Sequence, residues 1–179
     1  MTLTEVGSSV AKLKRWQLDF TSEFPSRYRI VSMNSFDHVR TLSREHFNTF
    51  TTAYSFLNIA CERDYQFSIL CLLKLQRVAL GIYGAFGKLW KGTESETQLQ
   101  LQVRTAKADA AVCADGLCMV VPWLTLPQNT VYGGIYALHL LQDAAEYYHE
   151  CVQGKQKQLA WCRQISMSLK RLHGIDVCF

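Results

Sequence analysis

The sequence predicts an all-α protein, a helical bundle of about seven helices in two helical halves. Apolar residues recur at three- and four-residue spacings in every long segment, and no segment alternates as a half-buried strand would. The 179 residues include only 3 prolines and 10 glycines, which suits long helices joined by few turns. About 49% of the residues are hydrophobic, so the chain is expected to fold around a real core.

The first two helices are expected within residues 1–61. Thr2 and Glu5 have the spacing of a capping box, and the helix that they begin should end before Pro25. A second helix is expected from residue 34 or 35 to about residue 61. Its buried face would be unusually aromatic and would include Phe36, Phe47, Phe50 and Tyr54.

Residues 64–90 are predicted to form the central helix. They are apolar on most sides, so other helices should enclose them. The residues expected to be deeply buried are Leu75, Val78, Ile82 and Phe86. Glycines at 81, 84 and 87 each cost about 1 kcal/mol of helix propensity, which favours a closely approaching neighbour. Lys74 and Arg77 leave apolar stretches too short for a membrane span, so no membrane contact is expected.

A polar run at residues 91–96 predicts the boundary between an N-terminal helical domain, 1–91, and a C-terminal helical domain, 92–179. The next helix should end at Asp115-Gly116. Two further helices are expected from residue 129 or 130 to about 153 and from 155 to 173, the last ending at Gly174.

Residues 117–129 are apolar but contain Pro122 and Pro127, so one regular helix is not expected there. A single small domain would not easily cover all of these side chains. The segment should therefore either wrap the core or meet a partner subunit, and we expect an interface with a second copy of the chain, formed by Pro122, Trp123, Leu124 and Leu126.

No arrangement of residues predicts an enzyme, a metal site or a cofactor. The glycines at 81, 84 and 87 follow no strand, and no two cysteines have the CxxC spacing. Glu146 and His149 have the Glu-x-x-His spacing of di-iron bundles, but no second copy of that motif exists. Seven scattered cysteines and no leader-like opening indicate reduced thiols in a cytoplasmic protein.

Charge is distributed unevenly along the chain. Residues 1–91 hold 12 Lys and Arg against 7 Asp and Glu, whereas residues 92–154 hold 2 against 7. The basic first half favours a polyanion, and the absence of a base-reading motif favours contacts to the phosphates of RNA. The residues predicted to bind RNA are Lys12, Arg15, Arg27, Arg29, Arg40 and Arg44. Ordinary solvated helix faces, or complementary surfaces within an oligomer, would give the same asymmetry.

The chain resembles the RNA-silencing suppressors of closteroviruses. The resemblance is carried by the aromatic segment SFDHVRTLSREHFNTFTTAYSF, the apolar helix after it and the helical second half. It implies an all-α homo-oligomer, in the form of a ring, that sequesters small or double-stranded RNA without sequence preference in the cytoplasm of an infected cell.

Two other functions remain open, both protein-interaction modules without nucleic acid. One is a helical groove binder that takes an amphipathic partner helix. The other is a pathogen effector that binds a host protein through residues 117–129. RNA binding should weaken steeply with salt, whereas apolar groove binding should not.

Overall fold

The computed structural model describes residues 3–23, 27–43, 45–87, 95–150 and 154–174, which fold mostly into helices. The described residues form six α-helices rather than the expected seven or so, and three short 3₁₀ turns. The helices are α1 (Leu3–Glu23), α2 (Asp37–Leu42), α3 (Ile59–Phe86), α4 (Ser95–Leu124), α5 (Thr130–Glu150) and α6 (Gln156–His173). The strands are β1 (Tyr28–Ser32) and β2 (Thr52–Phe56).

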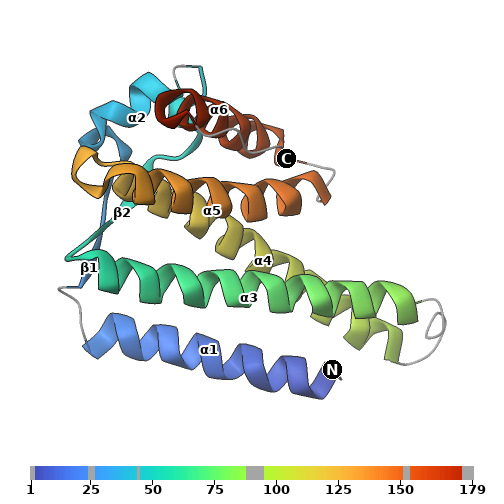
Figure 1. Cartoon of the computed structure of the whole chain (residues 1–179). Helices are drawn as coiled ribbons and strands as arrows, with labels where there is room; N and C mark the ends of the chain where they lie inside the picture. The colour runs from blue at the N-terminus through green and yellow to red at the C-terminus, as the bar shows by residue number, and fades with distance from the viewer. Residues whose placement is uncertain (1–2, 24–26, 44, 88–94, 151–153, 175–179) are drawn as a thin grey trace.

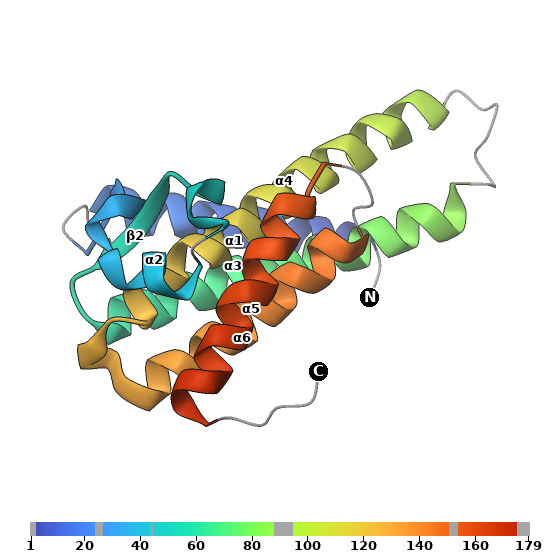
Figure 2. The same cartoon turned by 90° about the horizontal axis from the view of Figure 1, so that it is seen from above.

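The long helices pack largely in chain order. Figure 1 shows α3 and α4 running in opposite directions, with α1 along one side of α3 and with α5 and α6 on the other side. Strand β2 packs against α4, and α2 packs against α6. The end of α3 and the start of α4 extend beyond the other helices in both views (Figures 1 and 2).

The most enclosed helix is α4, and not the helix predicted to be central. Seven residues of its C-terminal half have no exposed surface: Ala110, Ala114, Leu117, Cys118, Val120, Val121 and Leu124. Small residues on this helix, among them Ala110 and Ala114, let its neighbours approach closely. At Gly116 an added Cβ would lie 3.3 Å from the Ile69 side chain of α3.

The predicted buried face of α3 is wrong. Val78 is 41% exposed and Phe86 48% exposed, and Leu75 and Ile82 are only half-buried. The face that packs against α4 instead carries Tyr65, Ile69, Leu72, Leu73, Gln76 and Ala79. Both stripes have three-four spacing, so periodicity cannot decide between them in a helix that is apolar on most sides. Phe86 also lies on the part of α3 that extends beyond the bundle.

The outer face of α3 is uncovered in the described part of the chain. A Cβ added at Gly81 or Gly84 would meet nothing within 4 Å, so the described residues do not supply the close neighbour expected there. By length and composition alone, α3 is the one described helix that could cross a membrane. Only 28% of its apolar 18-residue stretch is buried inside the protein. The same composition is found in core helices of folded domains.

The helix predicted from residue 34 or 35 to about residue 61 does not form. Its place is taken by α2, the 3₁₀ turns Met33–Ser35 and Phe47–Thr49, and β2. Strand β2 pairs with β1 in antiparallel register, from Tyr28 opposite Phe56 to Ser32 opposite Thr52. Threonine and aromatic residues favour strands over helices, and the segment TFTTAYSF is rich in both. The expected aromatic core is present, however, with Phe36, Phe47 and Phe50 all buried.

Helix α4 continues through Asp115-Gly116 and includes Pro122, contrary to the predicted break. Pro122 lies in the last turn, where the loss of one backbone donor removes only one helical hydrogen bond. His38 of α2 fixes this end of the helix, because its Nε2 lies 3.1 Å from both the Pro122 carbonyl oxygen and Thr125 Oγ1. At Gly133 a Cβ would lie 2.0 Å from the Leu124 carbonyl oxygen, so only glycine allows α5 to cross here.

Helices α5 and α6 confirm the last two predicted helices, and Gly174 caps α6 with a φ of 61°. Contacts distant in sequence join α6 to the first third of the chain. Ser43 Oγ donates to Gln164 Oε1 at 3.0 Å, and Ser168 Oγ donates to the Leu42 carbonyl oxygen at 2.9 Å. Phe50 meets Trp161 edge to face, with ring centres 5.0 Å apart. One hydrophobic core therefore contains residues from both halves of the chain.

Replacing Leu73 by alanine should destabilise the protein by about 2–5 kcal/mol, because it leaves a cavity between α3 and α4. Leu101→Ala is the matched control, since Leu101 of α4 is 62% exposed, and its effect should stay within about 0.5 kcal/mol. Chemical denaturation with circular dichroism measures both. Equal losses in the two variants would contradict the packing described here.

Candidate nucleic-acid interface

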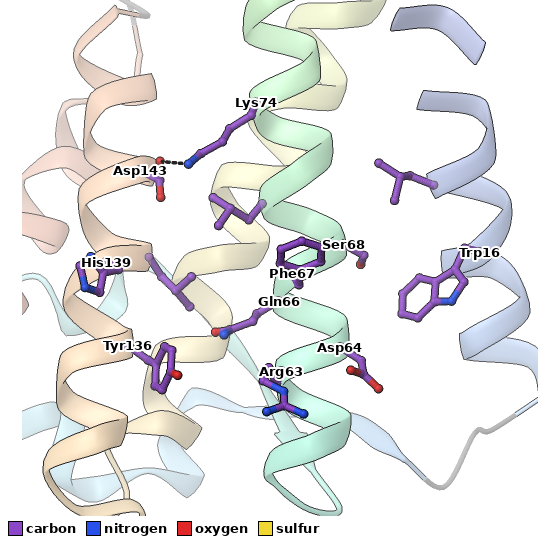
Figure 3. Close-up of a pocket in the computed structure, with 13 residues that line it drawn as sticks. Trp16, Arg63, Asp64, Gln66, Phe67, Ser68, Lys74, Tyr136, His139 and Asp143 are labelled. Carbon is purple, nitrogen blue, oxygen red and sulfur yellow. Dashed lines mark ion pairs between the residues drawn. The ribbon is translucent and has the colours of Figure 1, made fainter. Parts of the chain in front are cut away.

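A pocket of about 920 Å³ lies on the face where α1, α3 and α5 meet (Figure 3). This volume is within the range of about 300–1,000 Å³ that is typical of ligand pockets. Helix α3 runs along its centre, with α1 on one side and α5 on the other. The lining residues are Leu13 and Trp16 from α1; Arg63, Asp64, Gln66, Phe67, Ser68, Leu70 and Lys74 from α3; and Tyr136, His139, Leu140 and Asp143 from α5.

Three helices each contribute one partly exposed aromatic side chain to this pocket. Trp16 is 38% exposed, Phe67 65% and Tyr136 44%. No ring contact joins any two of these three among the described residues, so ring surface is left available on each. The indole of Trp16 is held on one side by Phe20, which stacks on it with ring centres 5.1 Å apart. Aromatic faces presented by separate rigid helices can stack with planar ligands.

The aromatic side chain of Phe20 connects the pocket to a larger cluster of rings. Tyr28 of β1 and Tyr65 of α3 stack with ring centres 5.1 Å apart, and both lie within 6.3 Å of the Phe20 ring. The guanidinium of Arg27 lies 5.7 Å from the centre of the Phe20 ring. This cluster packs β1 against α1 and α3, so Arg27 is connected to the pocket through contacting aromatic rings.

One polar group of the pocket has no partner among the described residues. Gln66 is 8% exposed, and its Oε1 accepts no hydrogen bond. In Figure 3 its side chain points from α3 toward α5. A buried acceptor without a donor costs about 1–3 kcal/mol, a cost that a ligand with an N–H or O–H group would remove.

Charges at the pocket are mixed. Arg63 and Asp64 are exposed at one end, and Lys74 lies 3.5 Å from Asp143 at the other. The Lys74 side chain is 60% exposed, so this ion pair is well solvated and holds the ammonium only weakly.

Four of the six predicted RNA-binding residues lie on α1 and β1, which follow one another along the chain. Lys12 and Arg15 are exposed on α1, and Lys12 lies one helical turn before Trp16. Arg27 and Arg29 lie at the start of β1, half-buried and exposed respectively. Among the described residues no carboxylate pairs with Lys12, Arg15 or Arg29. In contrast, Lys14 lies 2.6 Å from Asp109 and Lys155 3.1 Å from Asp115.

Arg40 is separated from this group. It lies on α2, at the opposite end of the molecule from α1 in Figure 1. Its guanidinium stands 4.8 Å from the centre of the Phe47 ring and donates to Asn34 Oδ1 at 3.3 Å. Arg44 lies outside the described residues.

The predicted interface residues are not on the surface. Pro122, Trp123 and Leu124 are buried within the chain, and Leu126 is half-buried against the core. The expectation that one domain could not cover them is therefore wrong, because α4 carries Pro122, Trp123 and Leu124 inward and Leu126 packs against the same core. Assembly of the chain into an oligomer stays a prediction, but an apolar surface at these residues no longer supports it.

No group of three or more His, Cys, Asp or Glu side chains that could hold a metal ion occurs among the described residues. Glu146 instead pairs with Arg77, at 3.2 Å.

Cys118 and Cys162 lie with Sγ atoms 3.5 Å apart in the core. The hydrogen bond with Cys118, and then burial, raises the pKa of the Cys162 thiol well above its usual value. A buried thiol with a raised pKa is a poor nucleophile.

Glu62, one turn before Gln66 on α3, is a second buried acceptor without a partner in the described part of the chain. It is 2% exposed, and burial raises its pKa from 4.5 to about 7, with a smaller opposing effect from Arg63. Between these values the folded protein keeps a proton that the unfolded chain releases. Stability contributed by this group is therefore complete below about pH 4.5 and is lost as the pH rises toward 7.

Glu62→Gln should remove this dependence, because the amide stays neutral. Near pH 8 the variant should be more stable than the unmodified protein by up to about 3 kcal/mol, the equivalent of the raised pKa. Near pH 4 the two should agree. Urea denaturation across this pH range measures the difference, and a constant difference at all pH values would show that Glu62 does not titrate in this way.

Sequence reasoning did not find Trp16, Phe67 and Tyr136 as site residues. Each occupies an apolar position of a helical repeat, where a core side chain is the usual interpretation. The sequence offers no signal for them beyond an aromatic content of 12%.

The chain was compared with protein-family models, with curated proteins and with solved structures, and none of them matches it. What the protein binds must therefore follow from the pocket and the cations themselves.

Proposed function

We propose that the protein binds RNA without sequence preference, and that by sequestering small RNAs it suppresses RNA silencing. The observation that carries the proposal is a set of three exposed cations, Lys12, Arg15 and Arg29, that have no carboxylate partner among the described residues, together with a pocket on α1 that is lined with aromatic side chains. Non-specific RNA-binding surfaces combine these two components, since cations contact the phosphates and aromatic rings contact the bases.

The cations support phosphate contact because they are not used elsewhere in the fold. Lys14, Lys74, Arg77 and Lys155 each hold a carboxylate of another helix, which accounts for them as structural. Lys12, Arg15 and Arg29 have no such partner among the described residues. Their exposed charges lower the chain's stability slightly by repulsion and gain a favourable partner only when an anion binds.

Replacing both Lys12 and Arg15 by glutamine should weaken RNA binding for all sequences alike. Each lost phosphate contact should lower the slope of log affinity against log salt by about 0.7–0.9. Fluorescence polarisation of labelled RNA over a salt series measures both effects. Glutamine keeps the helix propensity of α1, so the fold should be retained.

The matched control is Lys157→Gln with Arg171→Gln. These two residues are exposed on α6 and have no ion pair among the described residues. Their replacement removes the same charge from a different surface, so this variant should keep the salt slope of the unmodified protein. Equal losses in both double variants would indicate a general charge effect, and the absence of salt-dependent RNA binding in the unmodified protein would refute the proposal.

A second candidate is a protein-interaction module, which one groove favours. Helices α5 and α6 enclose about 630 Å³ over an apolar floor, with Met167 52% exposed beside it. An amphipathic helix is the partner that such a groove takes. Binding of this kind would change little with salt, so the same salt series separates it from RNA binding.

A further inference from the structure

The pocket between α1, α3 and α5 has features that phosphate binding alone does not require. Phe67 exposes 65% of its surface although it lies beside the apolar residue Leu70. Trp16 is fixed by its stacking on Phe20, and Tyr136 stands on the facing helix. These aromatic faces belong to separate helices and leave space between them for a flat group.

Gln66 Oε1, which has no partner among the described residues, indicates which hydrogen-bonding group the flat part of a ligand needs. It is an acceptor in a side chain more than nine-tenths buried, and it lines the same pocket. A ligand that satisfies it needs an N–H or O–H donor at the edge of its planar part. Every nucleobase has an N–H donor on its Watson–Crick edge, so this contact would be independent of sequence.

A base in a duplex cannot make these contacts. Its Watson–Crick edge is occupied by its partner, and its faces are covered by neighbouring bases. Only an unpaired nucleotide offers both a free face and a free N–H group. Arg63 of α3 lies at one end of the pocket (Figure 3), and Lys12 lies one helical turn before Trp16 on α1, so the flanking phosphates of a strand would find a cation on each of these helices.

We infer that this pocket is a nucleobase site that takes an unpaired nucleotide of the bound RNA, stacked on Phe67 and hydrogen-bonded to Gln66. The inference rests on the proposed RNA binding and adds to it that contact is made with single-stranded RNA, through the base as well as the phosphates.

The test compares Phe67→Ala with Phe86→Ala, a phenylalanine on the same helix that is 48% exposed and lies outside the pocket. Each variant is titrated with a short single-stranded RNA, with an abasic strand of the same length, with a blunt duplex and with a mononucleotide. Loss of one base stack costs about 1–3 kcal/mol, so Phe67→Ala should weaken the single-stranded RNA about 5- to 150-fold. It should leave the abasic strand and the duplex unchanged, and Phe86→Ala should change none of them.

Gln66→Leu provides a second, independent variant. Leucine fills a similar volume and removes the unpaired acceptor, so the fold should be kept or stabilised while single-stranded binding weakens and abasic binding does not. Circular dichroism and thermal unfolding check the fold of each variant.

The outcomes separate this inference from the proposed function. If the unmodified protein binds RNA with a steep salt dependence but Phe67→Ala has no effect on any strand, the nucleobase site is refuted and RNA binding stands. Equal losses on the intact and the abasic strand would also refute it. If the mononucleotide binds as tightly as the strand, the pocket is a site for free nucleotides and not for RNA. If no RNA binds at any salt concentration, the proposed function itself fails.

Discussion

The burial of α4 is the constraint on which the other elements depend. Its C-terminal half has no exposed surface at Ala114, Leu117 and Val121, because α3, α5 and β2 each cover one side of it. Small residues at this contact bring α3 close, and Gly133 lets α5 cross directly over the Leu124 carbonyl. The position of α3 then fixes where α1 packs, and the position of α5 fixes α6. Both walls of the candidate nucleotide pocket are therefore placed by a helix that contributes no residue to it.

Much of the helical content could be predicted from the sequence, but the partners of the helices could not. The three-four pattern with a glycine stop identified α5 and α6 closely, because each has a polar face that defines the apolar one. Helix α3 lacks such a face, so its pattern fits two stripes equally well, and the stripe through Val78 and Phe86 is the outer one. Between residues 35 and 56 the three-four spacing predicted a helix where the chain forms a strand, because spacing alone takes no account of the strand preference of threonine and aromatic residues.

The candidate site was predictable only in part, for a related reason. Exposed cations of a helix can be identified from their position off its apolar face, and Lys12 and Arg15 are indeed exposed on α1. Trp16, Phe67 and Tyr136 could not be identified, because an aromatic residue at an apolar position is buried in most proteins. Their exposure depends on how far apart α1, α3 and α5 lie, which is a property of the assembled core. Gln66 could not be identified from the sequence either, because the lack of a hydrogen-bond donor near its Oε1 is a property of the folded surroundings.

The contacts between α2 and α6 have a consequence for the order in which the molecule can form. Ser43 and Leu42 bond to residues more than a hundred positions later, and Phe50 packs against Trp161. The successive pairs α3–α4, α4–α5 and α5–α6 join neighbours in sequence, and contacts of this kind form quickly. During synthesis from the N-terminus, β2 can pack once α4 has formed, but α2 and Phe50 must wait for their partners until α6 has left the ribosome. The packing of the first third of the chain is therefore complete only when the last helix has folded against it.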